Sequence, residues 1–276
     1  MNPKVISRSL AGLIGVVCLN ISTANASLIV TQNDTATDLV SSILGGGITT
    51  SSESVLGAAD AFGTFTGGLA AGIGIESGIM LSSGNVADAP GPNSAPGTTT
   101  AHGTAGDADL TALSGFTTFD AAFLTFDFES DGGDLFFRFV FASEEYNEFV
   151  DSGVNDVFAF FLDGVNIGVI PGTSTPVTID TVNLGDHPGF FNDNEGGAFD
   201  IEYDGFTDVF TASFTGLSAG LHTIRMGIAD GGDSVLDSTV FIEGGSFSDQ
   251  ETTGIPEPSI ILLLASGLFA LGRRKQ

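Results

Sequence analysis

The run Leu135-Phe136-Phe137-Arg138-Phe139-Val140-Phe141 indicates the fold most clearly. Side chains alternate between the two faces of a β-strand, so the odd-numbered residues from Leu135 to Phe141 share one wholly apolar face. The other face places Arg138 between two apolar neighbours. Because aromatic and β-branched residues favour strands, the run predicts a strand with a buried face.

Similar apolar, β-prone runs recur along the chain and are bounded by Gly, Asp, Asn and Pro. The other runs are residues 28–31, 123–128, 157–162, 177–182, 209–214, 221–229 and 239–243. Runs of this kind without a long amphipathic helix predict an all-β fold. We expect an antiparallel β-sandwich, jelly-roll-like, in a single domain.

Shorter features interrupt the strands. One or two short helices are expected, over residues 37–44 and over residues 108–113, the second with Asp107 as its N-cap. Residues 84–106 are rich in Gly, Pro, Ser and Thr and predict a long loop. The sequence Gly-Leu-Ser-Ala-Gly at 216–220 has the spelling of a nucleophile elbow, but a β-prone run follows it, so we interpret it as a hairpin loop.

The body of the chain, residues 27–255, is strongly acidic. Two basic residues, Arg138 and Arg225, stand against 33 acidic ones, which leaves a formal charge of −31. Such a surface repels nucleic acid and anionic lipid, so cations are its natural partners. Each arginine lies within a β-prone run, and pairing with a carboxylate and exposure to solvent are both open for it. The one cysteine, Cys18, lies outside the body, which excludes disulfides and thiolate zinc sites there.

The N-terminal segment, residues 1–26, has the form of a secretory signal peptide. Lys4 and Arg8 precede an apolar run over residues 10–19. Ala24 and Ala26 then form an Ala-x-Ala cleavage site. A helix of ten residues rises about 15 Å and cannot span about 30 Å of hydrocarbon, which argues against a permanent anchor. We expect this segment to be removed on export.

The C-terminal segment, residues 256–276, has three parts. Pro256-Glu257-Pro258 comes first, an apolar run over residues 259–272 follows, and Arg273-Arg274-Lys275 ends it. The run predicts a short apolar helix that enters a membrane with its basic end in the cytoplasm and the body outside. This order resembles the PEP-CTERM sorting signal. The resemblance implies removal by an exosortase in the inner membrane of a Gram-negative bacterium, with delivery to the cell envelope, the cell surface or the extracellular matrix.

Acidic residues cluster where the predicted strands end. Carboxylates that lie close together repel one another unless they are solvated or share a counter-ion, and oxygen ligands suit Ca²⁺. Solvated turn residues are the alternative interpretation. The predicted calcium ligands are Glu144, Glu145, Asn155, Asp156, Asp230, Asp233 and Asp237. A further acidic cluster lies at residues 183–188 and 192–196.

Catalytic interpretations have little support in the sequence. His102, His187 and His222 lack the spacing of metal ligands. A glycosidase would need two facing carboxylates, which could come from Glu144, Glu145, Glu148 and Asp156. However, the chain has no tryptophan and two tyrosines, a poor supply of sugar-stacking rings. We therefore expect a protein that is not an enzyme.

A further resemblance covers the whole body. It rests on residues 77–84, 91–93, 106–110, 139–146, 155–164, 228–233 and 237–238. These segments are similar to the choice-of-anchor L domain of bacterial surface proteins, in which a PEP-CTERM tail is one of several anchoring signals. The resemblance implies an exported, all-β surface module and no established reaction or ligand.

Together these observations predict an exported structural or adhesion module that Ca²⁺ stabilises. We expect an exosortase as a transient partner. We expect extracellular polysaccharide or another surface protein as the partner of the mature protein. A lectin-like carbohydrate-binding module is the main alternative, and an enzyme that cleaves polysaccharide the less favoured one.

Overall fold

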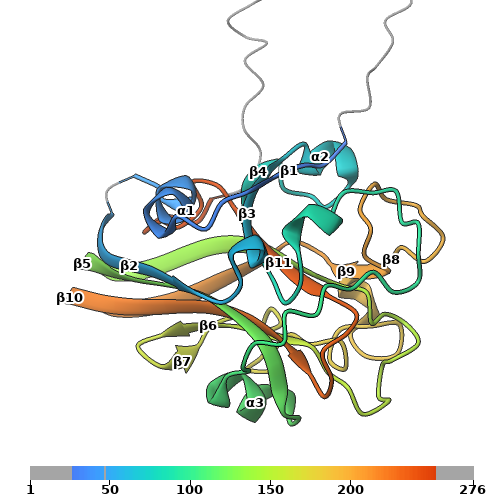
Figure 1. Ribbon diagram of the computed structural model, residues 1–276. Coiled ribbons are helices and arrows are strands. Elements are labelled where there is room, and N and C mark those ends of the chain that lie inside the picture. Colours follow the sequence, from blue (N-terminus) through green and yellow to red (C-terminus); the bar gives the residue numbers. More distant parts are fainter. Residues whose placement is uncertain (1–26, 47, 253–276) are drawn as a thin grey trace, which may run out of the picture.

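A computed structural model describes residues 27–46 and 48–252 (Figure 1). The predicted cleavage site, sorting signal and apolar tail helix lie outside the described residues, and with them Ala24, Ala26, Pro256, Glu257, Pro258, Arg273 and Arg274. Within the described ranges no helix is both long enough and apolar enough to cross a membrane.

The described residues are mostly antiparallel β-sheet with short helices, which confirms the predicted all-β class. The strands are β1 (Ile29–Gln32), β2 (Thr49–Leu56), β3 (Phe62–Thr66), β4 (Ser77–Ser82), β5 (Thr118–Ser143), β6 (Val157–Leu162), β7 (Val165–Asn166), β8 (Phe191–Asp193), β9 (Gly205–Thr207), β10 (Phe210–Gly231) and β11 (Ser238–Glu243). The α-helices are α1 (Ala36–Ile43), α2 (Gly68–Ala71) and α3 (Ala108–Ser114), and the 3₁₀ helices are η1 (Ala59–Ala61), η2 (Val86–Asp88) and η3 (Pro188–Phe190).

Two long strands, β5 and β10, organise the sheet. They pair with each other along almost their whole length, run to one end of the molecule, turn there together and run back (Figure 1). The first layer contains residues 118–129 of β5 and 221–231 of β10, with β2, β6 and β7. The second layer contains residues 135–143 of β5 and 210–214 of β10, with β11, β4, β3 and β1. The two layers of this sandwich therefore belong to one continuous open sheet.

Glycines at the turn allow both strands to stay hydrogen-bonded while they bend. Gly132 and Gly133 in β5 have φ angles of 91° and 119°, and Gly216 and Gly220 in β10 have 73° and 130°. Residues without a Cβ adopt this region without steric cost. A register shift between Phe214 and Leu217 adds a local bulge, which increases the bend.

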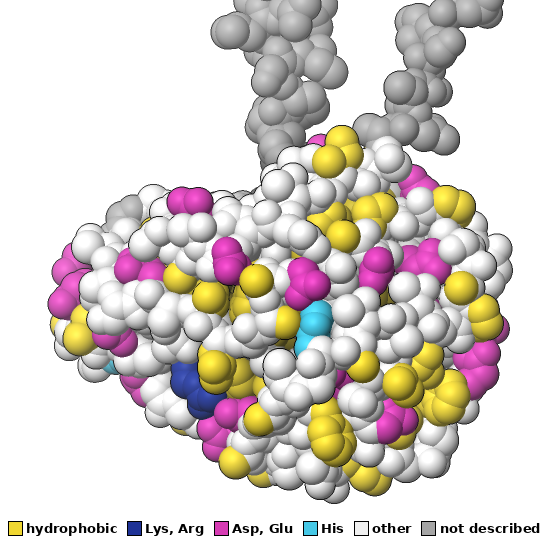
Figure 2. Space-filling model, in the orientation of Figure 1, with side chains coloured by type: hydrophobic (Ala, Val, Ile, Leu, Met, Phe, Trp, Pro, Cys, Tyr) yellow, Lys and Arg dark blue, Asp and Glu magenta, His cyan; other side chains and the backbone are white. Residues whose placement is uncertain are grey.

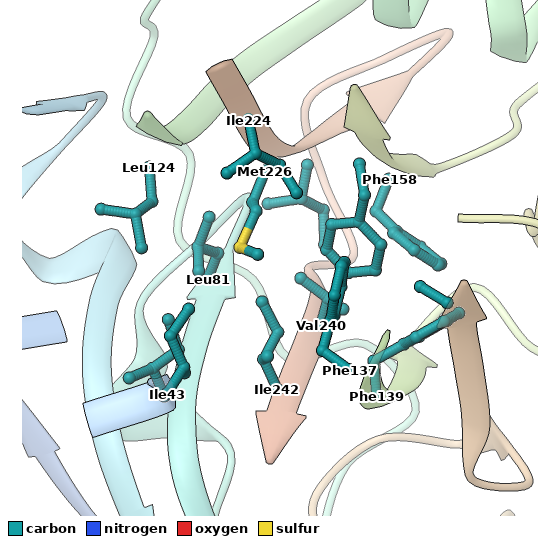
Figure 3. Close-up of a cluster of buried hydrophobic side chains, with 14 of the residues drawn as sticks. Ile43, Leu81, Leu124, Phe137, Phe139, Phe158, Ile224, Met226, Val240 and Ile242 are labelled. Carbon is teal, nitrogen blue, oxygen red and sulfur yellow. The ribbon is translucent and has the colours of Figure 1, made fainter. Parts of the chain in front are cut away.

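The space between the layers is filled with apolar side chains. Phe247 lies at its centre, with its ring 5.2 Å from Phe126 and Phe128 and 5.6 Å from Phe137. Each aromatic pair adds about 0.5 to 1.5 kcal/mol beyond the burial of its area. Figure 3 shows Ile224 and Met226 of the first layer reaching toward side chains of the second. Residues far apart in the chain thus share one core.

Both body arginines pair with carboxylates. Arg138 lies 2.7 Å from Glu243, and Arg225 lies 3.1 Å from Asp107 and 2.9 Å from Asp109. Of the two alternatives left open by the sequence, pairing is therefore confirmed.

Three expectations about local structure were wrong. Residues 123–128 and 135–141 form one strand, as do residues 209–214 and 221–229, because the sheet continues through the bend. For the same reason residues 216–220 lie inside β10 and are not a hairpin loop. Residues 177–182 form turns instead of a strand: the Thr178 carbonyl accepts from the N–H groups of Thr181 and Val182. Their apolar side chains are buried in the core, and a short apolar run does not distinguish a strand from a buried turn.

Other local expectations are confirmed. The helices at residues 37–44 and 108–113 correspond to α1 and α3, and the Asp107 side chain caps α3 by accepting from the Asp109 and Leu110 N–H groups. Residues 84–106 are largely irregular, as expected for a loop. This loop covers the outer side of the second layer, where Val86 and Ala89 share a second apolar cluster with Phe241 of β11.

Candidate functional site

The open end of the sandwich, opposite the bend, collects the ends of four strands. In the first layer β10 ends at Gly231 beside the start of β6 at Val157. In the second layer β5 ends at Ser143 opposite Ser238, where β11 begins. Polar residues that follow or precede these strands are therefore brought to one place, although they are up to about ninety positions apart in the chain.

Three of the predicted ligands form a buried group, here called the inner cluster: Glu145, Asp156 and Asp230. Each is at most 1% exposed. Asp156 accepts from the Gly231 N–H at 2.9 Å and from Ser238 Oγ at 2.6 Å. One oxygen of Glu145 accepts from the Asp156 N–H at 3.3 Å. Asp230 Oδ1 is buried without a hydrogen-bond partner in the described part of the chain.

Burial dominates the electrostatics of the inner cluster. It raises the pKa of Asp156 to about 8, despite the hydrogen bonds from Ser238 and Gly231 that lower it. Burial and then the charge of Asp156 raise the pKa of Glu145 to about 11. The pKa of Asp230 also lies well above its ordinary range, for the same two reasons. These groups hold protons at neutral pH unless a cation neutralises them.

The body's arginines are engaged elsewhere, Arg138 with Glu243 and Arg225 with the N-terminus of α3. Figure 2 shows acidic side chains spread over one face of the molecule and basic atoms gathered at a single spot. The three carboxyl groups therefore share a buried space without a basic side chain to balance their charge.

Glu144 lies beside the inner cluster and is 1% exposed. Neither of its carboxyl oxygens has a hydrogen-bond partner among the described residues. Burial, together with repulsion from Asp204 and Glu202, raises the pKa of Glu144 to about 9. A buried carboxylate in this position lowers the stability of the fold unless it is protonated or binds a cation.

The three remaining predicted ligands have visible structural roles. Asn155 donates from Nδ2 to the Ser114 carbonyl at 3.0 Å and accepts at Oδ1 from the Asp180 N–H at 3.3 Å. Asp237 accepts from the Thr100 N–H at 2.9 Å and so fixes the long loop. Asp233 is only partly buried and accepts from the Val235 N–H at 3.1 Å, as a turn residue does. None of the three belongs to the inner cluster.

Two buried acids that the sequence analysis did not select lie close to Glu144. Glu202 accepts from the Ser94 N–H at 3.1 Å and from Thr98 Oγ1 at 2.8 Å. Asp204 accepts from Asn93 Nδ2 at 2.6 Å. The sequence does contain a pattern that could have indicated these two acids. They alternate with Ile201 and Tyr203, which places both carboxyl groups on one side of an extended segment.

A surface hollow opens beside Asp204. Its lining consists of residues 93–96, Glu148, Glu195 and Asp204. Among the described residues no group of three or more His, Cys, Asp or Glu side chains is placed so that it could hold a metal ion by itself. A cation at either place would thus need backbone, hydroxyl or water oxygens as well, which Ca²⁺ readily accepts.

Comparison with known proteins places this fold in a family. No curated protein and no solved structure matches the chain. The sequence pattern of the choice-of-anchor L domain does match, over residues 28–248, a range that includes every strand described above and both acidic groups. Such a domain indicates a surface-associated, exported protein. The chain belongs to the choice-of-anchor L family.

Proposed function

We propose that this protein is a structural or adhesion module of the bacterial surface whose two sheet layers are locked together by Ca²⁺ at the inner cluster. The observation that carries the proposal is the burial of Glu145, Asp156 and Asp230 where the layers meet, with Asp230 Oδ1 unpartnered among the described residues. A metal ion that binds the folded state and not the unfolded one stabilises the fold by mass action.

The donor set favours Ca²⁺ over other common metals. Carboxylate oxygens dominate it, and the Ser238 hydroxyl lies 2.6 Å from Asp156. The body has no thiolate, so soft metals lack their preferred ligand. Ca²⁺ takes six to eight oxygen ligands in flexible geometry, whereas Mg²⁺ demands a near-ideal octahedron.

The strong negative charge of the body, together with bound cations, also suggests which class of partner the protein contacts. The body repels other polyanions at its formal charge of −31, and both of its arginines are occupied by carboxylates. Bridging cations would let it contact an acidic extracellular polysaccharide or another acidic surface protein. This partner class distinguishes a matrix module from a lectin, which would bind neutral sugars as well.

We propose that the protein is not an enzyme, and the one serine–histidine–aspartate contact in the described residues supports this. His222 Nδ1 lies 2.6 Å from Asp163, and Nε2 lies 3.0 Å from the Ser218 carbonyl and 3.4 Å from Ser218 Oγ. A nitrogen that donates to a carbonyl cannot at the same time take the proton of the serine. The arrangement fits a structural link between β10 and the β6–β7 turn.

For the chain ends we propose export by the segment 1–26 and processing by an exosortase at Pro256-Glu257-Pro258, in a Gram-negative host. Mass spectrometry of the protein recovered from the cell surface tests this. We expect a new N-terminus at Ser27 and loss of the apolar tail. Recovery of the tail in the surface-bound protein would contradict the processing.

Thermal unfolding with chelator and with Ca²⁺ tests the calcium claim. Ca²⁺ at 100 times its Kd adds about 2.7 kcal/mol, which raises Tm by about 5 to 10 °C in a protein of this size. Asp230→Asn should reduce this rise and increase Tm in chelator, because it removes a ligand of the inner cluster and replaces a buried carboxyl group with a neutral amide. Glu129→Gln, an exposed change on β5, is the control and should keep the rise. An equal Ca²⁺ response in Asp230→Asn and wild type would refute the assignment.

A further inference from the structure

The hollow beside Asp204 is separate from the inner cluster and is built by three segments that are distant in the chain. We call it the outer basin and define it by Asn93, Glu148, Glu195 and Asp204. Asn93 comes from the long loop, Glu148 from the turn after β5, and the other two from the β8–β9 region.

Asp204 is the key side chain, because it is buried yet faces the hollow. It is 3% exposed and lines the basin. Its Oδ1 accepts from Asn93 Nδ2 at 2.6 Å, whereas its Oδ2 is buried and has no hydrogen-bond partner within the described ranges. A buried carboxylate oxygen without a donor is costly, and because Asp204 lines the basin, a cation bound there would satisfy this oxygen.

The rest of the basin adds negative charge and rigid geometry. Glu195 Oε1 accepts from the Asn147 N–H at 3.2 Å and from Asn147 Nδ2 at 3.0 Å, which fixes that side chain against the turn after β5. Asn93 Nδ2 also donates to the Asn194 carbonyl at 3.1 Å. Burial, against the hydrogen bond from Asn93 and together with the charges of Glu148 and Glu195, raises the pKa of Asp204 to about 6.

We propose that the outer basin is a second Ca²⁺ site, with Asp204 Oδ2 as the direct ligand and with Glu148 and Glu195 holding the ion directly or through water. The ion would join the long loop, the turn after β5 and the β8–β9 region. Because the basin opens to solvent, water completes the shell and the ion exchanges readily. The proposal stands on residues outside the inner cluster and does not depend on the function proposed above.

Calorimetric titration of the purified protein with CaCl₂ tests the proposal by counting sites. We expect two equivalents of Ca²⁺ in wild type. Asp204→Asn should bind one equivalent, because it keeps the contact with Asn93 and removes the charge. The double variant Glu148→Gln/Glu195→Gln should weaken the same equivalent at least tenfold. Glu129→Gln should bind both.

Asp230→Asn separates this claim from the inner-cluster claim. If both claims hold, it loses one equivalent and the combination with Asp204→Asn loses both. If Asp204→Asn binds as many equivalents as wild type, with the same affinities, the outer site is refuted whatever Asp230→Asn does. If Asp230→Asn alone leaves the count unchanged, the inner site fails and the outer one stands. Circular dichroism of each variant verifies that it is folded.

Discussion

Ser238 Oγ donates a hydrogen bond of 2.6 Å to Asp156 Oδ2, and this contact joins the start of β11 in the second layer to the start of β6 in the first. Both residues are fully buried. Asp156 also accepts from the Gly231 N–H at the end of β10. One carboxyl group thus connects three strands at the open end of the sandwich, where the chain crosses between the layers through residues 144–156 and 232–237.

Ser238→Ala should therefore destabilise the fold. It leaves one oxygen of a buried carboxyl group without its donor, which costs about 1 to 3 kcal/mol. Urea unfolding in the presence of chelator measures the loss. Ser213→Ala, at an exposed position of β10, is the matched control and should change stability by less than about 0.5 kcal/mol. Equal effects of the two substitutions would show that the contact does not hold the layers together.

The inner cluster predicts an unusual pH dependence of the metal-free protein. The folded pKa values of Asp156 and Glu145, about 8 and about 11, lie above those of the unfolded chain, so the folded state binds more protons. Stability should then fall as pH rises from about 4, the unfolded value, toward the folded values. Urea unfolding in chelator should give a lower free energy at about pH 8 than at about pH 5. Ca²⁺ should flatten this slope, and a chelated protein that is more stable at the higher pH would contradict the account.

The contact between His222 and Asp163 predicts that the pKa of His222 is higher than that of an ordinary histidine. The hydrogen bond that His222 Nδ1 donates to Asp163 raises the pKa of His222, although burial opposes it. The contact stabilises the fold fully at a pH below the pKa that His222 has in the unfolded chain. This stabilisation is lost as the pH rises through the pKa of His222 in the folded protein. Asp163→Asn should lower the pKa of His222 in an NMR titration, and Asp131→Asn, an exposed change at the bend, should leave it unchanged. The same value in wild type and Asp163→Asn would contradict the assigned cause.

Gly84 should tolerate no side chain. A Cβ at this position would overlap the carboxyl group of Asp237, which fixes the long loop by accepting from the Thr100 N–H. Gly84→Ala should destabilise the protein by about 2 to 4 kcal/mol in urea unfolding. Gly189→Ala is the control, since a Cβ there meets no atom within 4 Å. If both variants unfold at the same urea concentration as wild type, the close approach of Asp237 has no energetic importance.

The sequence predicted some of the strands that are buried on both faces, such as residues 157–162, all six of which are buried in β6. It missed β4, although every residue of that strand after Ser77 is also buried. It did not reveal β2, whose sequence is mostly Ser and Thr and which pairs only with β5. It also could not show that the sheet continues through Gly216 and Gly220, because a bend in a paired strand and a hairpin turn use the same residues.

The candidate site was predictable to the extent that it follows strand ends. Glu145, Asp156 and Asp230 each lie within two residues of a strand end in the structure, and within four of a strand end that the sequence indicated. Asp204 was not predicted, because its partner Asn93 is 111 positions away and lies in an irregular loop. Only the tertiary fold brings such a pair together, and no local pattern in the sequence specifies it.

Anomalous diffraction from crystals of the protein grown with Tb³⁺ in place of Ca²⁺ tests the central claim most directly, because it locates the ion. The account predicts a strong peak within bonding distance of the carboxyl oxygens of Asp156 and Asp230, and its loss in Asp230→Asn crystals. A peak confined to the molecular surface, with the inner carboxyl groups hydrogen-bonded only to one another or to water, would contradict it.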